Sequence, residues 1–177
     1  MRILILFSGN GSLLDLVDRH ECTDYWIGLT NNPASPALKK HYHKGLILQP
    51  KDINQHLADY GAIYDAILLL GYNKIIPDYL CEKYDGKMVN LHPSLLPKYA
   101  GLYKENVIQA TLENHDKVAG ATLHYVDKDV DKGRIWTQRE VIIEPGSTVQ
   151  TLYDDVKAVE RILLGNFLKW KQNVIFS

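Results

Sequence analysis

The sequence has few features that would place it outside the ordinary globular class. It contains only two cysteines, Cys22 and Cys81, in 177 residues, so it has no disulfide framework. Its 20 lysines and arginines are balanced by 21 aspartates and glutamates, and the formal charge of −1 offers no basic surface for nucleic acid. No apolar run approaches the roughly 20 residues of a membrane span. We therefore expect a cytoplasmic protein with no membrane or nucleic-acid partner.

The length and composition fit one globular domain. The residues are 46% hydrophobic and 23% charged, which is typical of folded domains of roughly 100–200 residues. The apolar run at residues 3–7 is too short for a secretory signal, and a polar, glycine-rich stretch follows it. Because the chain shows no repeat and no linker, we predict a single domain over residues 1–177.

Short apolar runs alternate with helical patterns along the first two-thirds of the chain. Strands are predicted at residues 3–7, 25–30, 45–48, 64–70, 87–91, 119–126 and 134–143. Helices are predicted at residues 12–17, 35–43, 53–60, 105–114 and from 149 to about 167, with short helical turns after Pro77. The alternation predicts an α/β fold, a Rossmann-like domain with a mostly parallel sheet flanked by helices. In such sheets ligands bind beyond the carboxyl ends of the strands.

The stretch Ser-Gly-Asn-Gly-Ser at residues 8–12 lies between a predicted strand and a predicted helix. Its two glycines let the backbone approach a ligand, and the helix start directs free N–H groups at an anion such as phosphate. The third glycine of a dinucleotide-binding fingerprint is absent, because Leu14 takes its place. A tight turn without a ligand is the alternative interpretation, with Ser12 near the helix cap.

Two polar residues end the strand at residues 87–91. Asn90 and His92 are two positions apart, so their side chains point to the same side of the strand. An amide and an imidazole there suit a reaction that develops charge on oxygen and moves a proton. A carboxylate from the turn at residues 127–133 would orient His92 and favour its protonated form. Taken singly, an Asn and a His at a strand end are more often structural than catalytic, and composition alone favours a solvated charged loop at residues 127–133.

Other polar residues are interpreted as structural. His124 lies on a strand face and is typical of a core histidine. Lys157 and Glu160 are neighbours on one helix face and are most simply a surface ion pair. His41 and His43 have no third ligand nearby, so no metal site is predicted.

Four separate stretches of the chain form one pattern. They are residues 8–12, Asn-Leu-His-Pro-Ser-Leu-Leu-Pro-Lys-Tyr-Ala-Gly at 90–101, Gly-Ala-Thr-Leu-His-Tyr-Val at 120–126 and Asp-Lys-Gly at 131–133. Together they resemble the folate-dependent formyltransferase family, over residues 1 to about 170. The second stretch, followed at a distance by Asp-x-Gly, is specific for that family. The first stretch indicates the branch that formylates glycinamide ribonucleotide.

The resemblance implies roles for individual residues. Those that match the catalytic triad of the family are Asn90, His92 and Asp131. Those that match substrate-binding positions are Gly11, Ser12 and Leu13 in the phosphate loop, and Lys157 and Glu160 in the last helix. Those that match the folate pocket are Asn73, Lys74, Ile75, Ile76, Asn90, Asp127, Lys128, Asp129, Val130 and Asp131.

The resemblance also implies a reaction. A formyl group would pass from 10-formyltetrahydrofolate, as co-substrate, to the amine of glycinamide ribonucleotide in de novo purine biosynthesis, without a metal, in a monomer or homodimer. Leu13 and Lys157 stand where the family usually has Asn and Gln, which leaves a nucleotide-linked amino sugar open as acceptor. A nucleotide-binding module without catalysis is the other alternative. The region 34–52 is shorter than in typical members, and Lys51 is the candidate there for a basic folate contact.

Overall fold

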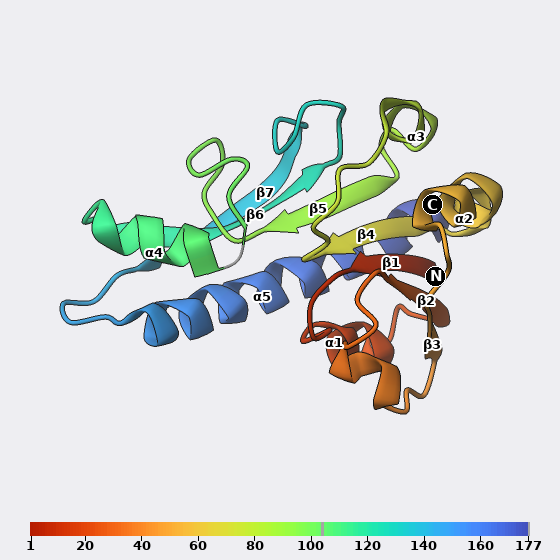
Figure 1. The fold of residues 1–177 in the computed structure, drawn as a ribbon, viewed down its shortest axis with the longest axis horizontal. Coiled ribbons are helices and arrows are strands. Elements are labelled where there is room, and N and C mark those ends of the chain that lie inside the picture. The colour runs from red at the N-terminus through yellow and green to blue at the C-terminus, as the bar shows by residue number, and fades with distance from the viewer. Residues whose placement is uncertain (104, 177) are drawn as a thin grey trace.

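One seven-stranded sheet organises the molecule (Figure 1). The computed structural model describes residues 1–103 and 105–176, with side chains to Val174. The sheet order is β3-β2-β1-β4-β5-β6-β7, in which the first five strands are parallel and the last two antiparallel. The strands are β1 Arg2–Phe7, β2 Tyr25–Thr30, β3 Gly45–Leu48, β4 Ala66–Leu70, β5 Met88–His92, β6 Val118–Tyr125 and β7 Ile135–Ile142. The predicted α/β fold with a mostly parallel sheet is confirmed.

Helices cover both faces of the sheet. They are α1 Leu14–Arg19, α2 Ile53–Tyr60, α3 Asp78–Lys83, α4 Glu105–Glu113 and α5 Val149–Phe176, with 3-10 turns η1 Pro36–Lys39 and η2 Gly61–Ile63. The buried residues of α1, α4 and α5 pack on one face, and those of α2 and α3 pack on the other. Figure 1 shows α5 running under the sheet from the α4 end to the α2 end. Within the described chain, no helix combines the length and hydropathy needed to cross a bilayer.

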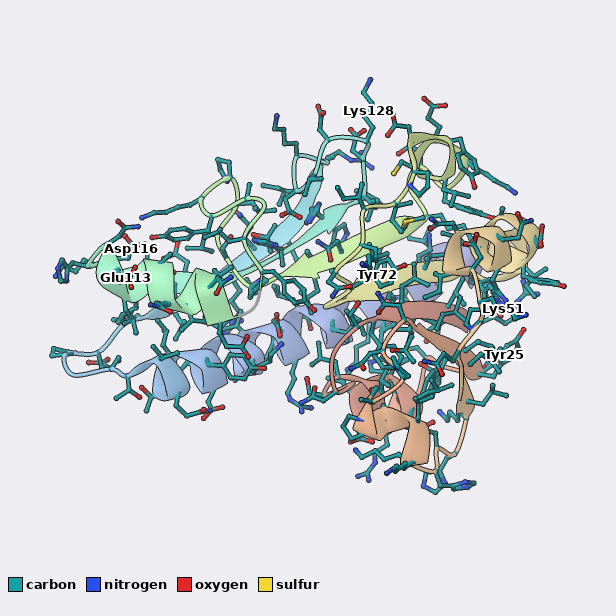
Figure 2. All side chains as sticks on the ribbon, viewed as in Figure 1. Tyr25, Lys51, Tyr72, Glu113, Asp116 and Lys128 are labelled. Carbon is teal, nitrogen blue, oxygen red and sulfur yellow. The ribbon has the colours of Figure 1, made fainter. Side chains whose placement is uncertain are left out.

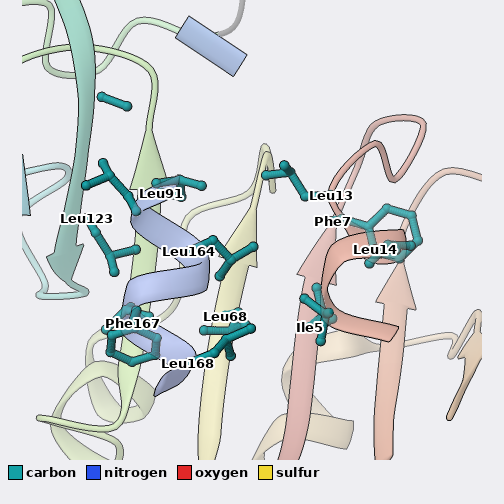
Figure 3. Packing of buried hydrophobic residues seen from close by; sticks show 14 of the residues in the cluster. Ile5, Phe7, Leu13, Leu14, Leu68, Leu91, Leu123, Leu164, Phe167 and Leu168 are labelled. Carbon is teal, nitrogen blue, oxygen red and sulfur yellow. The ribbon is translucent and has the colours of Figure 1, made fainter. Parts of the chain in front are cut away.

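Strand β1 shows how the core is built. Ile3, Ile5 and Phe7 belong to the core under α1 and α5, whereas Leu4 and Leu6 belong to the core under α2 and α3. A parallel strand covered on both faces is apolar throughout, which is why the run at the start of the sequence lacks alternation. Figure 3 shows side chains of α5 packed against the sheet residues Leu68, Leu91 and Leu123. The two cores hold the carboxyl ends of β1, β4 and β5 side by side.

Three predicted helices differ from the structure. The helix predicted at residues 35–43 is only the turn η1, because extended residues, Ser35 and Lys40, flank Pro36–Lys39. Helix α1 begins at Leu14, and its N-cap is Leu13 without a side-chain hydrogen bond, so Ser12 is not the cap. Helix α5 continues to Phe176, beyond the last apolar position of the predicted face.

Candidate active site

A cavity of about 790 Å³ opens at the carboxyl ends of β1, β4 and β5. It is lined by the glycine-rich loop after β1, the segment after β4, the end of β5, the loop after β6 and the middle of α5. This is where a parallel α/β sheet binds its ligands, since the loops that follow parallel strands meet at one edge. These five regions, far apart in the sequence, therefore face one common space.

Asn90, His92 and Asp131 meet at one side of this cavity. The Nδ1 atom of His92 lies 3.5 Å from Oδ2 of Asp131. The Nδ2 atom of Asn90 donates to Oδ1 of Asp131 at 3.3 Å. Asp131 adopts a positive φ of 56°, and its Oδ2 accepts a hydrogen bond from the backbone N–H of Gly101 at 2.9 Å. The structure therefore brings together the three residues that the sequence pattern placed in a triad.

His124 joins this cluster, although the sequence interpretation left it in the core. It stands directly opposite Asn90 in the antiparallel register of β5 and β6. Its Nε2 lies 3.1 Å from Nδ2 of Asn90 and 3.5 Å from Oδ1 of Asp131, and its Nδ1 lies 2.9 Å from the carbonyl of Tyr125. When Nδ1 carries the proton and donates to Tyr125, Nε2 accepts from Asn90. His124 reaches this cluster through the pairing of β5 with β6, and spacing in the sequence does not reveal that pairing.

Burial and neighbouring polar groups shift the pKa values of His92 and Asp131. Desolvation lowers the pKa of His92 below its ordinary value and His124 lowers it further, while Asp131 and the backbone carbonyl of Tyr99 oppose the shift. Burial alone would raise the pKa of Asp131, but the neighbouring His124, the charge of His92 and the backbone N–H of Gly101 hold it below its ordinary value. Asp131 favours the protonated form of His92, as expected, but burial outweighs it, so at neutral pH the free protein holds a neutral imidazole beside a carboxylate.

The glycine-rich loop after β1 lines the cavity. Gly11 has a φ of 72°, and a Cβ there would lie 2.6 Å from Cδ1 of Leu14. Leu13 lines the cavity, yet its side chain is buried in the core under α1. The guanidinium of Arg161 on α5 donates to the carbonyl of Ser12 at 3.1 Å and anchors the loop. Replacement of the family's usual Asn by Leu13 therefore leaves the backbone donors in place.

Lys157 and Glu160 are not a surface pair. Both line the cavity, and Glu160 is only 3% exposed. The Nζ atom of Lys157 donates to Oε2 of Glu160. Burial raises the pKa of Glu160, and the nearby charges of Lys157 and Arg161 oppose that shift. The spacing in the sequence shows that the two residues are neighbours on α5, but it does not show how deeply their side chains are buried.

The segment after β4 forms the opposite side of the cavity, with Asn73, Lys74, Ile75 and Ile76 among its lining residues. The side-chain oxygen of Asn73 accepts from Ser8 Oγ at 2.7 Å and from Asn31 Nδ2 at 3.0 Å, and its backbone N–H donates to Ser8 Oγ at 2.9 Å. Asn73 therefore ties together the ends of β1, β2 and β4. Ile75 is 72% exposed at the rim, whereas Ile76 is buried.

The loop after β6 contributes most of its predicted residues. Those that line the cavity are Asp127, Lys128, Val130 and Asp131; Asp129 is exposed and lies outside the lining. Lys51 is also exposed and outside the lining, and Figure 2 shows it near Tyr25, away from Lys128. Among the described residues, no group of three or more His, Cys, Asp or Glu side chains is arranged to hold a metal.

Comparisons with known proteins match this arrangement. The formyl transferase family model matches residues 23–168. The phosphoribosylglycinamide formyltransferase of Haemophilus influenzae is 33% identical over 140 residues, which are 78% of this chain and 62% of that protein. The trifunctional purine biosynthetic protein adenosine-3 of Homo sapiens is 33% identical over 175 residues, 90% of this chain and 17% of that protein. The chain thus spans less than two-thirds of either curated relative.

Solved structures share the whole fold. The phosphoribosylglycinamide formyltransferase of Anaplasma phagocytophilum superimposes with a TM-score of 0.83 at 25% identity, covering 98% of this chain and 87% of that one. The glycinamide ribonucleotide transformylase 1 of Symbiobacterium toebii gives a TM-score of 0.82 at 25% identity, covering 98% and 88%. The fold and the family pattern therefore extend together over nearly the whole chain.

Proposed function

Since the chain belongs to the formyl transferase family, we propose that it transfers a formyl group from 10-formyltetrahydrofolate to the amine of glycinamide ribonucleotide. The observation that carries the proposal is the meeting of Asn90, His92 and Asp131 at the wall of a cavity that also contains the glycine-rich loop. The names of the curated and solved relatives support the same acceptor. The cavity is large enough for two small substrates to meet.

The glycine-rich loop and α5 suit the acceptor. Backbone N–H groups at residues 11–13 would hold the phosphate monoester, since three free oxygens can each accept hydrogen bonds there. Lys157 and Glu160 would contact the rest of the ribonucleotide from the same wall. Because the side chain of Leu13 lies in the core, the substitution at this position gives no support to a nucleotide-linked amino sugar.

The opposite wall suits a folate. Backbone and apolar side chains at residues 73–76 and the loop at 127–131 would enclose the pteridine ring. Exposed apolar side chains at the rim, Ile75 and Val130, offer a surface for the flat aromatic parts of the donor. Lys74 and Lys128 bring positive charge to the same side for its carboxylates.

The chemistry follows from the protonation states. The acceptor amine attacks the formyl carbon, a nitrogen–carbon bond forms, and the former carbonyl oxygen becomes an oxyanion. Neutral His92 takes the proton from the attacking nitrogen, and Asp131 stabilises the resulting imidazolium. Asn90 exchanges one of its amide hydrogen bonds for the oxyanion. The bond to the folate nitrogen then breaks, and His92 returns the proton to that nitrogen.

A panel of amines offered with 10-formyltetrahydrofolate, followed by the absorbance of the folate product, tests the proposal. Glycinamide ribonucleotide should be the preferred acceptor. The dephosphorylated riboside should have a kcat/KM lower by roughly tenfold or more, as expected for losing hydrogen bonds to a charged group. Inorganic phosphate should compete with the ribonucleotide and not with the folate. Preference for a nucleotide-linked amino sugar would overturn the acceptor, and absence of turnover with every amine would overturn formyl transfer.

A further inference from the structure

The loop between β5 and α4 supplies two backbone groups to the catalytic pair. The N–H of Gly101 donates to Oδ2 of Asp131 at 2.9 Å. The backbone carbonyl of Tyr99 faces the imidazole of His92 and favours its protonated form. The charged and titratable groups that face His92 are Asp131 and His124. A single loop therefore touches both members of the pair without contributing a catalytic side chain.

Tyr99 holds this loop in a conformation that a tyrosine rarely adopts. Its φ is 63°, in the left-handed region where glycine is normally required. Such a conformation persists only when surrounding contacts enforce it. The turn continues through a hydrogen bond from the N–H of Leu102 to the carbonyl of Tyr99, which places Gly101 in front of Asp131.

Asp116 fixes the side chain of Tyr99 from outside the cavity. The hydroxyl of Tyr99 donates to Oδ2 of Asp116 at 2.9 Å, and Nδ2 of Asn114 donates to the same hydroxyl at 2.9 Å. The ammonium of Lys98 donates to Oδ1 of Asp116, whose side chain is only 13% exposed. Burial alone would raise the pKa of Asp116, but hydrogen bonds from Lys98 and Tyr99 hold it below its ordinary value. Asp116 is therefore a carboxylate with both oxygens occupied.

Asp116 does not belong to the substrate cavity. Figure 2 shows it beyond the end of α4 beside Glu113, at the left end of the molecule, whereas Tyr72, which lines the cavity, lies near the middle. Its backbone N–H is fixed to the carbonyl of Thr111 at 3.2 Å, so the carboxylate is carried by the rigid end of α4. None of the roles implied by the family pattern falls on Asp116 or Tyr99.

We propose that Asp116 is a positioning residue for formyl transfer, which holds Tyr99 in its left-handed conformation and so keeps the Tyr99 carbonyl on His92 and the Gly101 amide on Asp131. The inference rests on the proposed function of the same site. Loss of the anchor lets Tyr99 relax to negative φ, which moves Gly101 away from Asp131. Neither Tyr99 nor Asp116 lines the cavity, so the loss falls on kcat and leaves binding intact.

Two variants and one matched control test this role. Asp116→Ala removes the acceptor, and Tyr99→Phe removes only the hydroxyl and keeps the ring. Glu113→Gln is the control. Glu113 is an exposed carboxylate at the end of α4, and among its described hydrogen bonds it accepts only from Gln109, at 2.8 Å. The readouts are kcat and KM for both substrates, the melting temperature, and the Gly101 amide resonance in glycine-labelled protein, assigned with Gly101→Ala.

Both test variants should lower kcat by roughly tenfold, the factor expected from one misaligned hydrogen bond to a charged group, with both KM values within about threefold. The Gly101 amide proton should move upfield and exchange faster with solvent, because it no longer donates to a carboxylate. Asp116→Glu should recover more activity than Asp116→Ala, and Glu113→Gln should behave as the parent protein.

The resonance separates this inference from the proposed function. If the parent protein formylates no amine, the proposed function fails, and the Gly101 amide still reports whether Asp116 positions the loop. An unchanged Gly101 resonance in folded Tyr99→Phe and Asp116→Ala overturns the positioning role. A shifted resonance with unchanged kcat also overturns it, because the loop position would then have no effect on the reaction.

Discussion

The two sides of the cavity differ in the residues that adopt a positive φ. On the side proposed to bind the phosphate, the turn with positive φ is made by Gly11, and a glycine adopts that conformation without steric penalty. On the catalytic side, Tyr99 and Asp131 adopt it as well, at a cost of about 1–3 kcal/mol each. In the proposed function, the glycine-rich loop binds phosphate with backbone N–H groups alone, whereas the catalytic side needs a carboxylate at a fixed position. The strain therefore lies where a side chain, and not merely a turn, is required.

The largest effect should come from the catalytic side. His92→Ala removes the group that carries the proton, and kcat should fall by roughly 10²–10³, the range found when a single group acting on the transition state is lost. The melting temperature should change little, and pre-steady-state mixing gives the chemical step directly. His56→Ala, on α2 outside the cavity lining, is the matched control. Near-normal turnover in folded His92→Ala would remove His92 from the mechanism.

Asp131→Asn should have the next largest effect. Neutralising this carboxylate removes the charge that raises the pKa of His92, so that pKa should fall further. Because neutral His92 acts as the base, activity is lost as pH drops through that pKa, and the acid limb of the kcat/KM profile should move to lower pH. We expect kcat to fall by about 10–100-fold. If Asp131→Asn has the same acid limb of the kcat/KM profile and the same kcat as the parent protein, the charge of Asp131 has no role in the reaction.

The phosphate side should respond through KM. Gly11→Ala places a methyl group 2.6 Å from Leu14 at a φ of 72°, so the loop must shift. The KM for the ribonucleotide should rise by roughly tenfold, with a smaller change in kcat and in the KM for folate. Leu13→Asn is the matched change on the same loop. Because the wild-type Leu13 side chain points into the core, the family's usual residue should bring no gain in affinity.

The smallest effect on the reaction should come from Asp18, which lies beneath the phosphate side. Its buried carboxylate accepts from Trp26 Nε1 at 3.0 Å and from the N–H groups of His43 and Lys44 at 2.9 and 2.8 Å. Asp18→Asn should lower the free energy of unfolding by about 1–3 kcal/mol at pH 7, with kcat nearly unchanged.

The pH dependence checks this assignment. Burial alone would raise the pKa of Asp18, but its hydrogen bonds from His43, Lys44 and Trp26 hold it below the ordinary value. The stabilisation is therefore present above the unfolded pKa of about 4 and is lost as pH falls through the lower folded value. Urea titrations of parent and Asp18→Asn proteins should converge at low pH. A constant difference at every pH would assign the loss to packing instead of charge.

The parts that sequence predicted well are those set by local spacing. Strands β2 and β3 and helix α2 have the predicted bounds, and the pairing of Asn90 with His92 follows from the two-residue repeat of a strand. The burial of a side chain and the register between two strands depend on residues far away in the sequence. His124 is buried, as the sequence predicts, but its contact with Asn90 depends on the register of β5 and β6; the prediction from spacing that Glu160 lies on the surface is wrong, because Glu160 is 3% exposed. The cytoplasmic location, the single domain, the monomer or homodimer and the residue roles stay predictions.

The position of α5 in the chain has a consequence for synthesis. Its residues Leu164, Phe167 and Leu168 complete the core against Leu68 and Leu91, which are made long before it. Until α5 leaves the ribosome, the apolar side chains of β4, β5 and β6 that it covers stay exposed, and exposed apolar surface of this kind promotes aggregation or chaperone binding. A nascent chain stalled near residue 148 should therefore be protease-sensitive, and protection should arrive in one late step as α5 docks.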